Sequence, residues 1–99
     1  MGGWVYIMAN RYRGTIYIGV TADISRRAFQ HATGEGADFC KKYDLTQLVY
    51  AEYTERIEDA IAREKAMKKW RRDWKVALIE RANPDWLDLF NTLNGAPEE

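Results

Sequence analysis

The sequence predicts an α/β (α+β) fold in which helices flank a three-stranded antiparallel sheet, in the order β-β-α-β-α-α. Two strand-like runs with alternating side chains, 4–9 and 15–20, are joined by a short polar segment, which is typical of an antiparallel hairpin. A third strand-like run at 45–53 lies between stretches of helical spacing. The 99 residues suit one domain with a single core. We expect that core over about 3–82, with 83–99 as a C-terminal extension.

Composition excludes several classes of protein. Hydrophobic residues make up 46% of the chain and aromatic residues 13%, so disorder is excluded as the main state. No apolar run approaches the roughly 18 residues of a membrane span, and the N-terminus lacks a secretion signal. The single Cys40 cannot form an internal disulfide, and no Cys/His cluster suggests zinc. We therefore expect a soluble cytoplasmic protein without a membrane partner.

The formal net charge is zero, but the charges are unevenly distributed along the chain. Residues 61–75 carry seven Lys and Arg against Glu64 and Asp73, and acidic residues predominate after Asp73. A basic cluster of this kind is compatible with a face that binds a polyanion. It is equally compatible with the solvated side of a helix.

The hairpin brings two tyrosines to one face of the predicted sheet. If Met8 pairs with Thr15, Tyr6 lies opposite Tyr17, because side chains alternate between the faces of a strand. Gly19 continues the tyrosine face without a side chain and leaves room for something to approach the backbone. The apolar residues of the opposite face are Val5, Ile7, Ile16 and Ile18.

The first helix carries two polar residues on an otherwise apolar face. Thr21 or Asp23 can cap it, and Gly34 is a natural end. Arg27 and His31 lie one turn apart and share a face with two apolar residues, Ile24 and Ala28. We expect a loop of mixed composition over 34–44 before the third strand.

A long helix is predicted from Thr54 or Glu55 to about Arg72. Its apolar face consists of Ile57, Ala60, Ile61 and Met67. Glu64 falls near the middle of this face. Because unpaired burial of a carboxylate is costly, Glu64 either has a partner or lies beside a site.

Two further helices are predicted towards the C-terminus. The first runs from Trp74 to about Ala82 and ends at Asn83-Pro84, because the residue before a proline disfavours helical geometry. A short last helix over 85–93 would dock Trp86, Leu89 and Phe90 inward. We assign Trp70, Trp74 and Trp86 to the core and not to base stacking.

Five of these residues occur in an order and spacing that resemble the GIY-YIG nuclease superfamily: Tyr6, Tyr17, Arg27, His31 and Glu64. The closest resemblance is to its short stand-alone bacterial members, often called YhbQ-like, and it extends over nearly the whole chain. Tyr17-Ile18-Gly19 keeps the second motif, whereas the first reads Trp4-Val5-Tyr6 and keeps only the tyrosine. The combination is far more specific than either triplet.

The resemblance implies a single GIY-YIG nuclease-like domain and metal-dependent hydrolysis of DNA phosphodiester bonds. Glu64 would bind one Mg²⁺ or Mn²⁺ ion, and Arg27 would hold the scissile phosphate. A tyrosine would take a proton from the attacking water, with Tyr6 preferred and Tyr17 positioning water or phosphate. Because free tyrosine has a pKa near 10, a cation such as Arg27 would have to favour the phenolate. His31 would relay the proton or contact the phosphate.

The resemblance also suggests substrate-binding residues, namely Gly19, Lys41, Lys42, Lys68 and Asn83. The expected partner is DNA, recognised by its structure or without specificity, in repair or recombination. Target choice would depend on DNA structure, a homodimer or a partner protein.

Other interpretations of these residues stay open. The scaffold could serve as a nucleic-acid-binding module with little turnover, or as a protein-interaction domain. Arg27 could form an ion pair with Asp23, and Glu64 with Lys68, as neighbours one helical turn apart often do.

Overall fold

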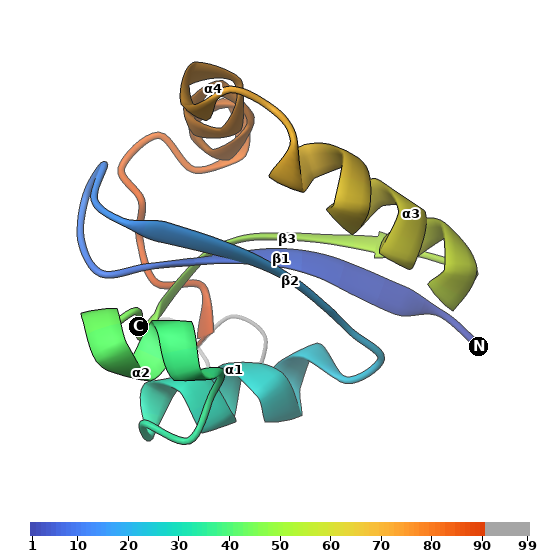
Figure 1. Ribbon diagram of the computed structural model, residues 1–99, viewed down its shortest axis with the longest axis horizontal. Helices are drawn as coiled ribbons and strands as arrows, with labels where there is room; N and C mark the ends of the chain where they lie inside the picture. The colour runs from blue at the N-terminus through green and yellow to red at the C-terminus, as the bar shows by residue number, and fades with distance from the viewer. Residues whose placement is uncertain (91–99) are drawn as a thin grey trace, which may run out of the picture.

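Figure 1 shows the computed structural model, which describes residues 1–90 of the chain. One antiparallel sheet in the order β2-β1-β3 is formed by β1 (Gly3–Ala9), β2 (Ile16–Thr21) and β3 (Gln47–Thr54). The helices are α1 (Ile24–Ala32), α2 (Asp38–Tyr43), α3 (Ile57–Lys68) and α4 (Arg72–Ala82). α3 and α4 cover one face of the sheet, and α1 and α2 cover the other (Figure 1). The predicted α/β (α+β) fold is confirmed, with α2 as an additional helix.

The predicted pairing of Met8 with Thr15 is wrong by two residues, because Met8 pairs with Tyr17. Thr15 belongs to the turn, where its backbone N–H donates to the Asn10 side chain at 2.9 Å. A shift of two residues leaves every side chain on its predicted face. Tyr6 and Tyr17 therefore still share one face, but as diagonal neighbours.

The turn between β1 and β2 is fastened to α4. Arg13, in the left-handed region with φ of 52°, donates two hydrogen bonds of 2.7 Å to the Glu80 carboxylate. Glu80 also accepts from the indole N–H of Trp86 at 2.8 Å. Arg72 donates to the carbonyl oxygens of Arg13 and Gly14 at 2.8 and 2.7 Å. These contacts hold the closed end of the hairpin against both ends of α4 and the segment that follows it.

The sheet separates two clusters of buried side chains. Beneath α3 and α4 lie Val5, Ile7, Ala9, Ile18, Val49, Ala60, Met67, Ile79 and Trp86. On the side of α1 and α2 lie Tyr6, Met8, Ile24, Ala28, Cys40, Leu45 and Leu48. The alternation of side chains along β1 supplies both clusters, because this central strand is covered on both faces.

α1 begins and ends as predicted. The Asp23 side chain accepts the Arg26 backbone N–H at 3.1 Å, and Gly34 follows the helix with φ of 82°. The expected loop over 34–44 is partly wrong, because residues 38–43 form α2. A six-residue helix is too short to produce a repeating apolar pattern that the sequence would reveal.

The long helix predicted from Thr54 or Glu55 to about Arg72 is present but shorter than predicted, because α3 spans Ile57–Lys68. Thr54 still belongs to β3, so α3 begins later than predicted. The helix ends at Lys68, and Trp70 then packs, partly buried, against the core. α4 begins at Arg72, two residues before the predicted start.

After α4 the chain turns at residues 84–85 and has no regular secondary structure over residues 86–89, so this part of the predicted last helix is wrong. Residues 91–93 of that prediction lie outside the described part of the chain. The inward packing is confirmed: Trp86 is buried, and Leu89 and Phe90 pack against the second cluster. The Leu89 backbone N–H donates to the Leu48 carbonyl oxygen at 2.7 Å and fastens the segment to β3.

The tryptophans differ from the prediction at one position. Trp86 is buried and Trp70 partly buried, but Trp74 is 53% exposed, so its assignment to the core is wrong. Across residues 1–90 we find no helix that combines the length and the apolar character needed to span a bilayer.

Candidate active site

Tyr6 lies at the centre of the candidate site, on the face of the sheet covered by α1. It is 1% exposed and directly opposite Gly19 on β2. A Cβ atom at Gly19 would lie 2.5 Å from Cζ of Tyr6 and would also overlap its hydroxyl. Glycine at position 19 therefore makes room for the tyrosine ring, and does not leave the opening for substrate that the sequence suggested.

His31 on α1 contacts Tyr6 from the helix side. The Tyr6 hydroxyl and His31 Nε2 are 3.2 Å apart and form a buried hydrogen bond. A Cβ atom at Gly36 would lie 2.6 Å from Cε1 of His31, so this loop glycine fits closely over the imidazole. His31 Nδ1 is buried without a hydrogen-bond partner in the described part of the chain. The site thus contains a buried polar pair that is fitted between two glycines.

Burial controls the protonation of both members of this pair. Desolvation raises the pKa of Tyr6 well above its usual value, and the positive charge of Arg27 opposes this only in part. Arg27 favours the phenolate of Tyr6, as expected, but burial has the larger effect and keeps the hydroxyl protonated. Burial, and then the charge of Arg27, lower the pKa of His31. Neutral His31 can accept the hydrogen bond that the Tyr6 hydroxyl donates.

Tyr17 completes an aromatic cluster around this pair. Its ring centre lies 6.4 Å from that of Tyr6 and 6.1 Å from that of His31. Phe39 of α2 stacks on its other side, with centres 6.1 Å apart and planes inclined by 27°. Tyr17 is partly exposed, whereas Tyr6 is closed off. Of the two tyrosines, only Tyr17 is open to water.

Arg27 lies one turn before His31 on α1 and is partly exposed. It lines a depression of about 280 Å³ at the start of the helix, together with residues of the 21–30 segment. The alternative ion pair with Asp23 is not formed within residues 1–90, because Asp23 caps the helix instead. The guanidinium of Arg27 remains available to an anionic ligand.

Glu64 reaches the site from the other face, along the β2 edge of the sheet. It is only 8% exposed, and its Oε2 is 2.6 Å from Nζ of Lys68. The alternative ion pair between the two residues is therefore present. The same Nζ lies 5.7 Å from the ring centre of Tyr17. Lys68, at the β2 edge of the sheet, thus lies between the Glu64 carboxylate and the aromatic cluster.

The residues at Glu64 fit a divalent cation with few protein ligands. Residues 1–90 contain no group of three or more His, Cys, Asp or Glu that could hold a metal ion. Magnesium accepts one or two carboxylates and completes its shell with water and substrate phosphate. Glu64 fits this pattern, provided that the ion displaces the Lys68 ammonium group.

The remaining predicted substrate contacts are dispersed. Lys41 and Lys42 are exposed on α2, beside the aromatic cluster. Asn83 is buried, and its amide N–H groups donate to the carbonyl oxygens of Val49 and Leu87 at 2.9 Å. Its oxygen accepts the Leu87 backbone N–H at 3.0 Å. The Asn83 amide therefore has a structural role at the end of α4 and is not available as a substrate contact.

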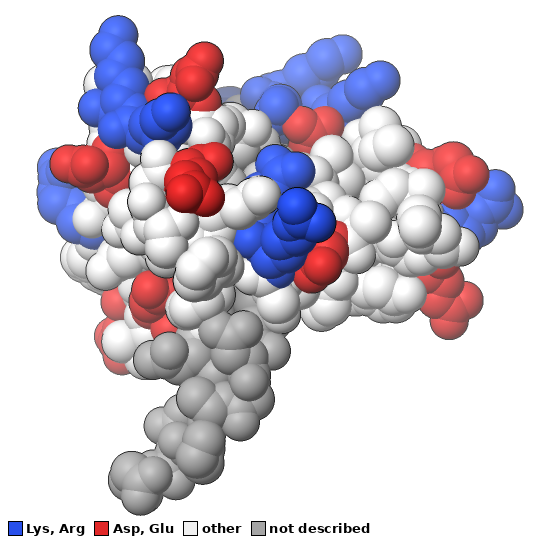
Figure 2. Space-filling view, turned by 90° about the horizontal axis from the view of Figure 1, so that it is seen from below, with Lys and Arg blue, Asp and Glu red and all other residues white. Residues whose placement is uncertain are grey.

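The charge on this side of the molecule is mixed. Figure 2 shows the face that carries α1 and α2, with Lys and Arg side chains singly or in small groups and acidic side chains between them. The described surface of this face offers local cationic contacts, such as Arg27, in place of a broad basic patch.

Two residues that contact the site were missed by sequence reasoning. Gly36 and Phe39 lie in the segment that was expected to be an irregular loop. The one signal was local: a second glycine, two residues after Gly34, precedes an aromatic residue. Neither shows periodicity, so their contacts with His31 and Tyr17 follow only from the fold.

Comparison with known proteins identifies a family model and several relatives that are similar to this chain. A family model described as the GIY-YIG catalytic domain matches residues 2–77. A UPF0213 protein of Staphylococcus saprophyticus is 34% identical over 76 residues, which are 77% of this chain and 92% of that protein. A UPF0213 protein of Haloquadratum walsbyi is 35% identical over 66 residues, covering 67% of this chain and 74% of its own.

A solved structure resembles the chain over nearly its whole length. The solution NMR structure of a UPF0213 protein from Bacillus halodurans has a TM-score of 0.56 and 27% sequence identity, covering 92% of this chain and 96% of its own. GIY-YIG domains are generally endonucleases and typically use divalent metals. The match of the family model to more than half of the chain and the identity to the relatives show that the protein belongs to the GIY-YIG family.

Proposed function

We propose that the protein is a divalent-metal-dependent endonuclease that hydrolyses DNA phosphodiester bonds. The observation that carries this proposal is the meeting of five side chains at the β2 edge. Tyr6, Tyr17 and His31 form one cluster, with Arg27 one turn away on the same helix. Glu64 joins it from α3 through a lysine. Hydrolysis needs a cation that binds the phosphate, a group that takes a proton from the attacking water and a ligand for the metal ion. These residues supply all three.

Arg27 is assigned to the scissile phosphate. Its guanidinium presents a fixed fork of donors that matches phosphate oxygens and holds them by charge-assisted hydrogen bonds. It borders a depression that Asp23 also lines, and it forms no ion pair within residues 1–90. This contact would orient the phosphorus atom for in-line attack.

The exposure of the two tyrosines separates their roles. Tyr17 is partly open to solvent, so we assign it to the attacking water. Tyr6 is closed off and bonded to His31, and its pKa is raised by burial. We assign this pair to positioning Tyr17, which departs from the preference for Tyr6 that the sequence suggested.

Glu64 is assigned to one metal ion, Mg²⁺ or Mn²⁺. When bound, the ion supplies Lewis-acid stabilisation of the leaving 3′ oxygen and of the additional negative charge. Glu64 would hold it at the sheet edge, where the Lys68 ammonium group lies beside the carboxylate. Lys68, released from Glu64, would then be able to contact a phosphate of the DNA backbone.

The test is cleavage by the purified full chain across plasmid, branched, single-stranded and duplex DNA. We expect nicking with Mg²⁺ or Mn²⁺ and none with EDTA. Arg27→Ala and Glu64→Gln should each abolish cleavage with an unchanged circular dichroism spectrum. Arg56→Ala and Glu58→Gln are the controls, because both residues are exposed at the start of α3, and both should keep wild-type rates. Cleavage that survives both site substitutions would refute the proposal.

A second candidate function is a nucleic-acid-binding module with little turnover. The observation that favours it is the short ion pair between Glu64 and Lys68, which occupies the only carboxylate assigned to metal. On this alternative, DNA affinity falls steeply with salt while no substrate of the panel is cut. A role in DNA repair or recombination, a homodimer or partner protein, and cytoplasmic location stay predictions.

A further inference from the structure

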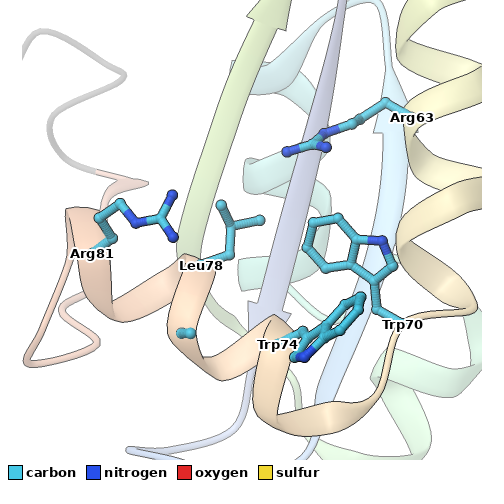
Figure 3. Close-up of a pocket in the computed structure, with 6 residues that line it drawn as sticks. Arg63, Trp70, Trp74, Leu78 and Arg81 are labelled. Atoms are coloured by element: carbon cyan, nitrogen blue, oxygen red, sulfur yellow. The ribbon is translucent and has the colours of Figure 1, made fainter.

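A cleft of about 280 Å³ lies between the end of α3 and α4, away from the candidate active site (Figure 3). Its lining residues are Arg63, Trp70, Trp74, Ala77, Leu78 and Arg81. The two indoles meet edge to face, with ring centres 6.1 Å apart and planes inclined by 75°. Figure 3 shows the guanidinium group of Arg63 above the Trp70 indole, and Arg81 farther along α4, beyond Leu78. The cleft therefore combines aromatic walls with a cationic rim.

The aromatic wall is not explained by packing of the core. Trp74 is 53% exposed, and besides the edge of Trp70 it has the guanidinium of Arg71 over its ring, with Cζ 5.1 Å from the ring centre. An exposed indole beside a cleft is informative, because large apolar side chains left open to solvent often mark a binding surface. Trp70 forms the floor, since it is partly buried and packs against the core on its other side.

The charge of the cleft is positive. No acidic residue lines it within the described chain. Arg63 lies 5.1 Å from the Trp70 ring centre and is partly neutralised by Glu52 at 2.8 Å. Arg81 is exposed and forms neither an ion pair nor a side-chain hydrogen bond within residues 1–90. One guanidinium is thus held in place over an indole, and a second is free to pair with an anion.

The cleft is distinct from the candidate active site. Arg63 and Glu64 are consecutive in α3, so their side chains leave the helix about 100° apart. Arg63 points towards Glu52 on β3, whereas Glu64 and Lys68 approach Tyr17 on β2. Because β3 and β2 are opposite edges of the sheet, the two sites lie on opposite sides of α3.

We propose that this cleft binds one unpaired nucleotide of single-stranded DNA, with the base stacked on Trp74 and the adjoining phosphate paired with Arg81. Its volume of about 280 Å³ is just below the range of about 300–1,000 Å³ for small-molecule pockets, which suits a single base better than a longer segment. Indole stacking is tolerant of base identity, and arginine supplies the charge-assisted contact with phosphate. This inference rests on the proposed function, because it selects DNA with a single-stranded region as the substrate.

The experiment is fluorescence anisotropy of the full chain with labelled oligothymidine in EDTA, so that cleavage does not interfere. Trp74→Ala should weaken binding roughly 5- to 100-fold, the range that alanine substitution of stacking aromatics produces. Arg81→Gln should weaken it less and reduce the salt dependence. Trp74→Phe keeps an aromatic face and should restore most of the affinity. Arg56→Gln, an exposed arginine at the other end of α3, is the matched control and should bind like the wild type.

Two further arms separate stacking from general attraction to DNA. An oligonucleotide with an abasic backbone should bind wild type and Trp74→Ala equally, because it has no base to stack. Blunt duplex DNA should likewise bind the wild type and Trp74→Ala with the same affinity. Unchanged oligothymidine binding by both Trp74→Ala and Arg81→Gln, at unchanged melting temperatures, would overturn the inference. The inference would also be overturned if Trp74→Ala lost the same amount of affinity for duplex, abasic and single-stranded DNA.

The outcome is distinguishable from failure of the proposed function. If Trp74→Ala binds oligothymidine normally while the wild type cuts DNA, only the cleft assignment fails. If the binding loss occurs as expected while no DNA is cut, the cleft assignment holds and the nuclease proposal fails.

Discussion

The two faces of the sheet are packed with different chemistry. Beneath α3 and α4 the buried cluster is apolar, around Met67 and Ile79, and the two buried polar side chains there, Glu64 and Asn83, are paired with Lys68 and with backbone groups. Beneath α1 a tyrosine and a histidine share a buried hydrogen bond, between two glycines with no room for a Cβ atom. A buried polar pair contributes less to stability than apolar packing of the same volume, and it leaves His31 Nδ1 without a partner. The difference indicates that the first face stabilises the fold and that the second is shaped for a site.

The largest expected effect is on the apolar face. Ile79→Ala should lower the free energy of unfolding by about 2–5 kcal/mol, because the fully buried side chain leaves a cavity. DNA cleavage per folded molecule should not change. Urea unfolding checks the stability, and Leu87→Ala, at a 63% exposed position, should cost less than about 0.5 kcal/mol. A loss of cleavage at full folding would contradict the separation of the two faces.

The second effect concerns Gly19 on the polar face. Gly19→Ala forces the Tyr6 ring to move, which should cost about 1–3 kcal/mol of stability. A displacement of about 1 Å in the cluster should reduce cleavage by about a hundredfold in the molecules that remain folded. Gly2→Ala is the control, because its Cβ meets only the exposed ring of Tyr53, which can turn away. Normal cleavage by Gly19→Ala would mean that Tyr6 has no part in the site.

The third prediction tests the sheet edge, where Lys68 joins the two faces. Lys68→Met leaves the buried Glu64 carboxylate unpaired and should destabilise the protein by about 1–3 kcal/mol. Added Mg²⁺ should raise the melting temperature of this variant more than that of wild type, because the ion no longer competes with an ammonium group. Lys65→Met, exposed on the same helix, should respond like wild type. An equal response of all three proteins would remove Glu64 as the metal ligand.

Patterns in the sequence predicted which side chains share a face, but not their partners. Alternation in β1 and β2 placed Tyr6 and Tyr17 together, yet a register error of two residues leaves this alternation unchanged. Glu64 was recognised because its position interrupts an apolar helix face, a signal that does not depend on tertiary contacts.

Features that depend on a short helix or a chain reversal could not be predicted. α2 has too few residues for periodicity, so the contact of Phe39 with Tyr17 was not foreseen. Trp70 and Trp74 both carry helical spacing, but α3 ends at Lys68, before Trp70, and α4 begins at Arg72, between the two tryptophans. As a result Trp70 packs against the core and Trp74 is exposed. The helix propensity of the local sequence does not distinguish these two positions.

The smallest effect is a pH dependence that belongs to the polar face. Burial lowers the pKa of His31, the only histidine of the chain, below the value of about 6.5 that it has when unfolded. The unfolded state therefore binds more protons below that pH, and stability should fall as the pH drops from about 7 to 5.

The slope can reach at most about 1.4 kcal/mol per pH unit for one proton, and it should flatten below the folded pKa. Urea unfolding across this range measures it. His31→Gln, which does not titrate, should remove the slope, whereas Ile79→Val on the apolar face should keep it. Parallel curves for wild type and His31→Gln would show that the imidazole is not held neutral, and the hydrogen bond donated by Tyr6 would then lack its acceptor.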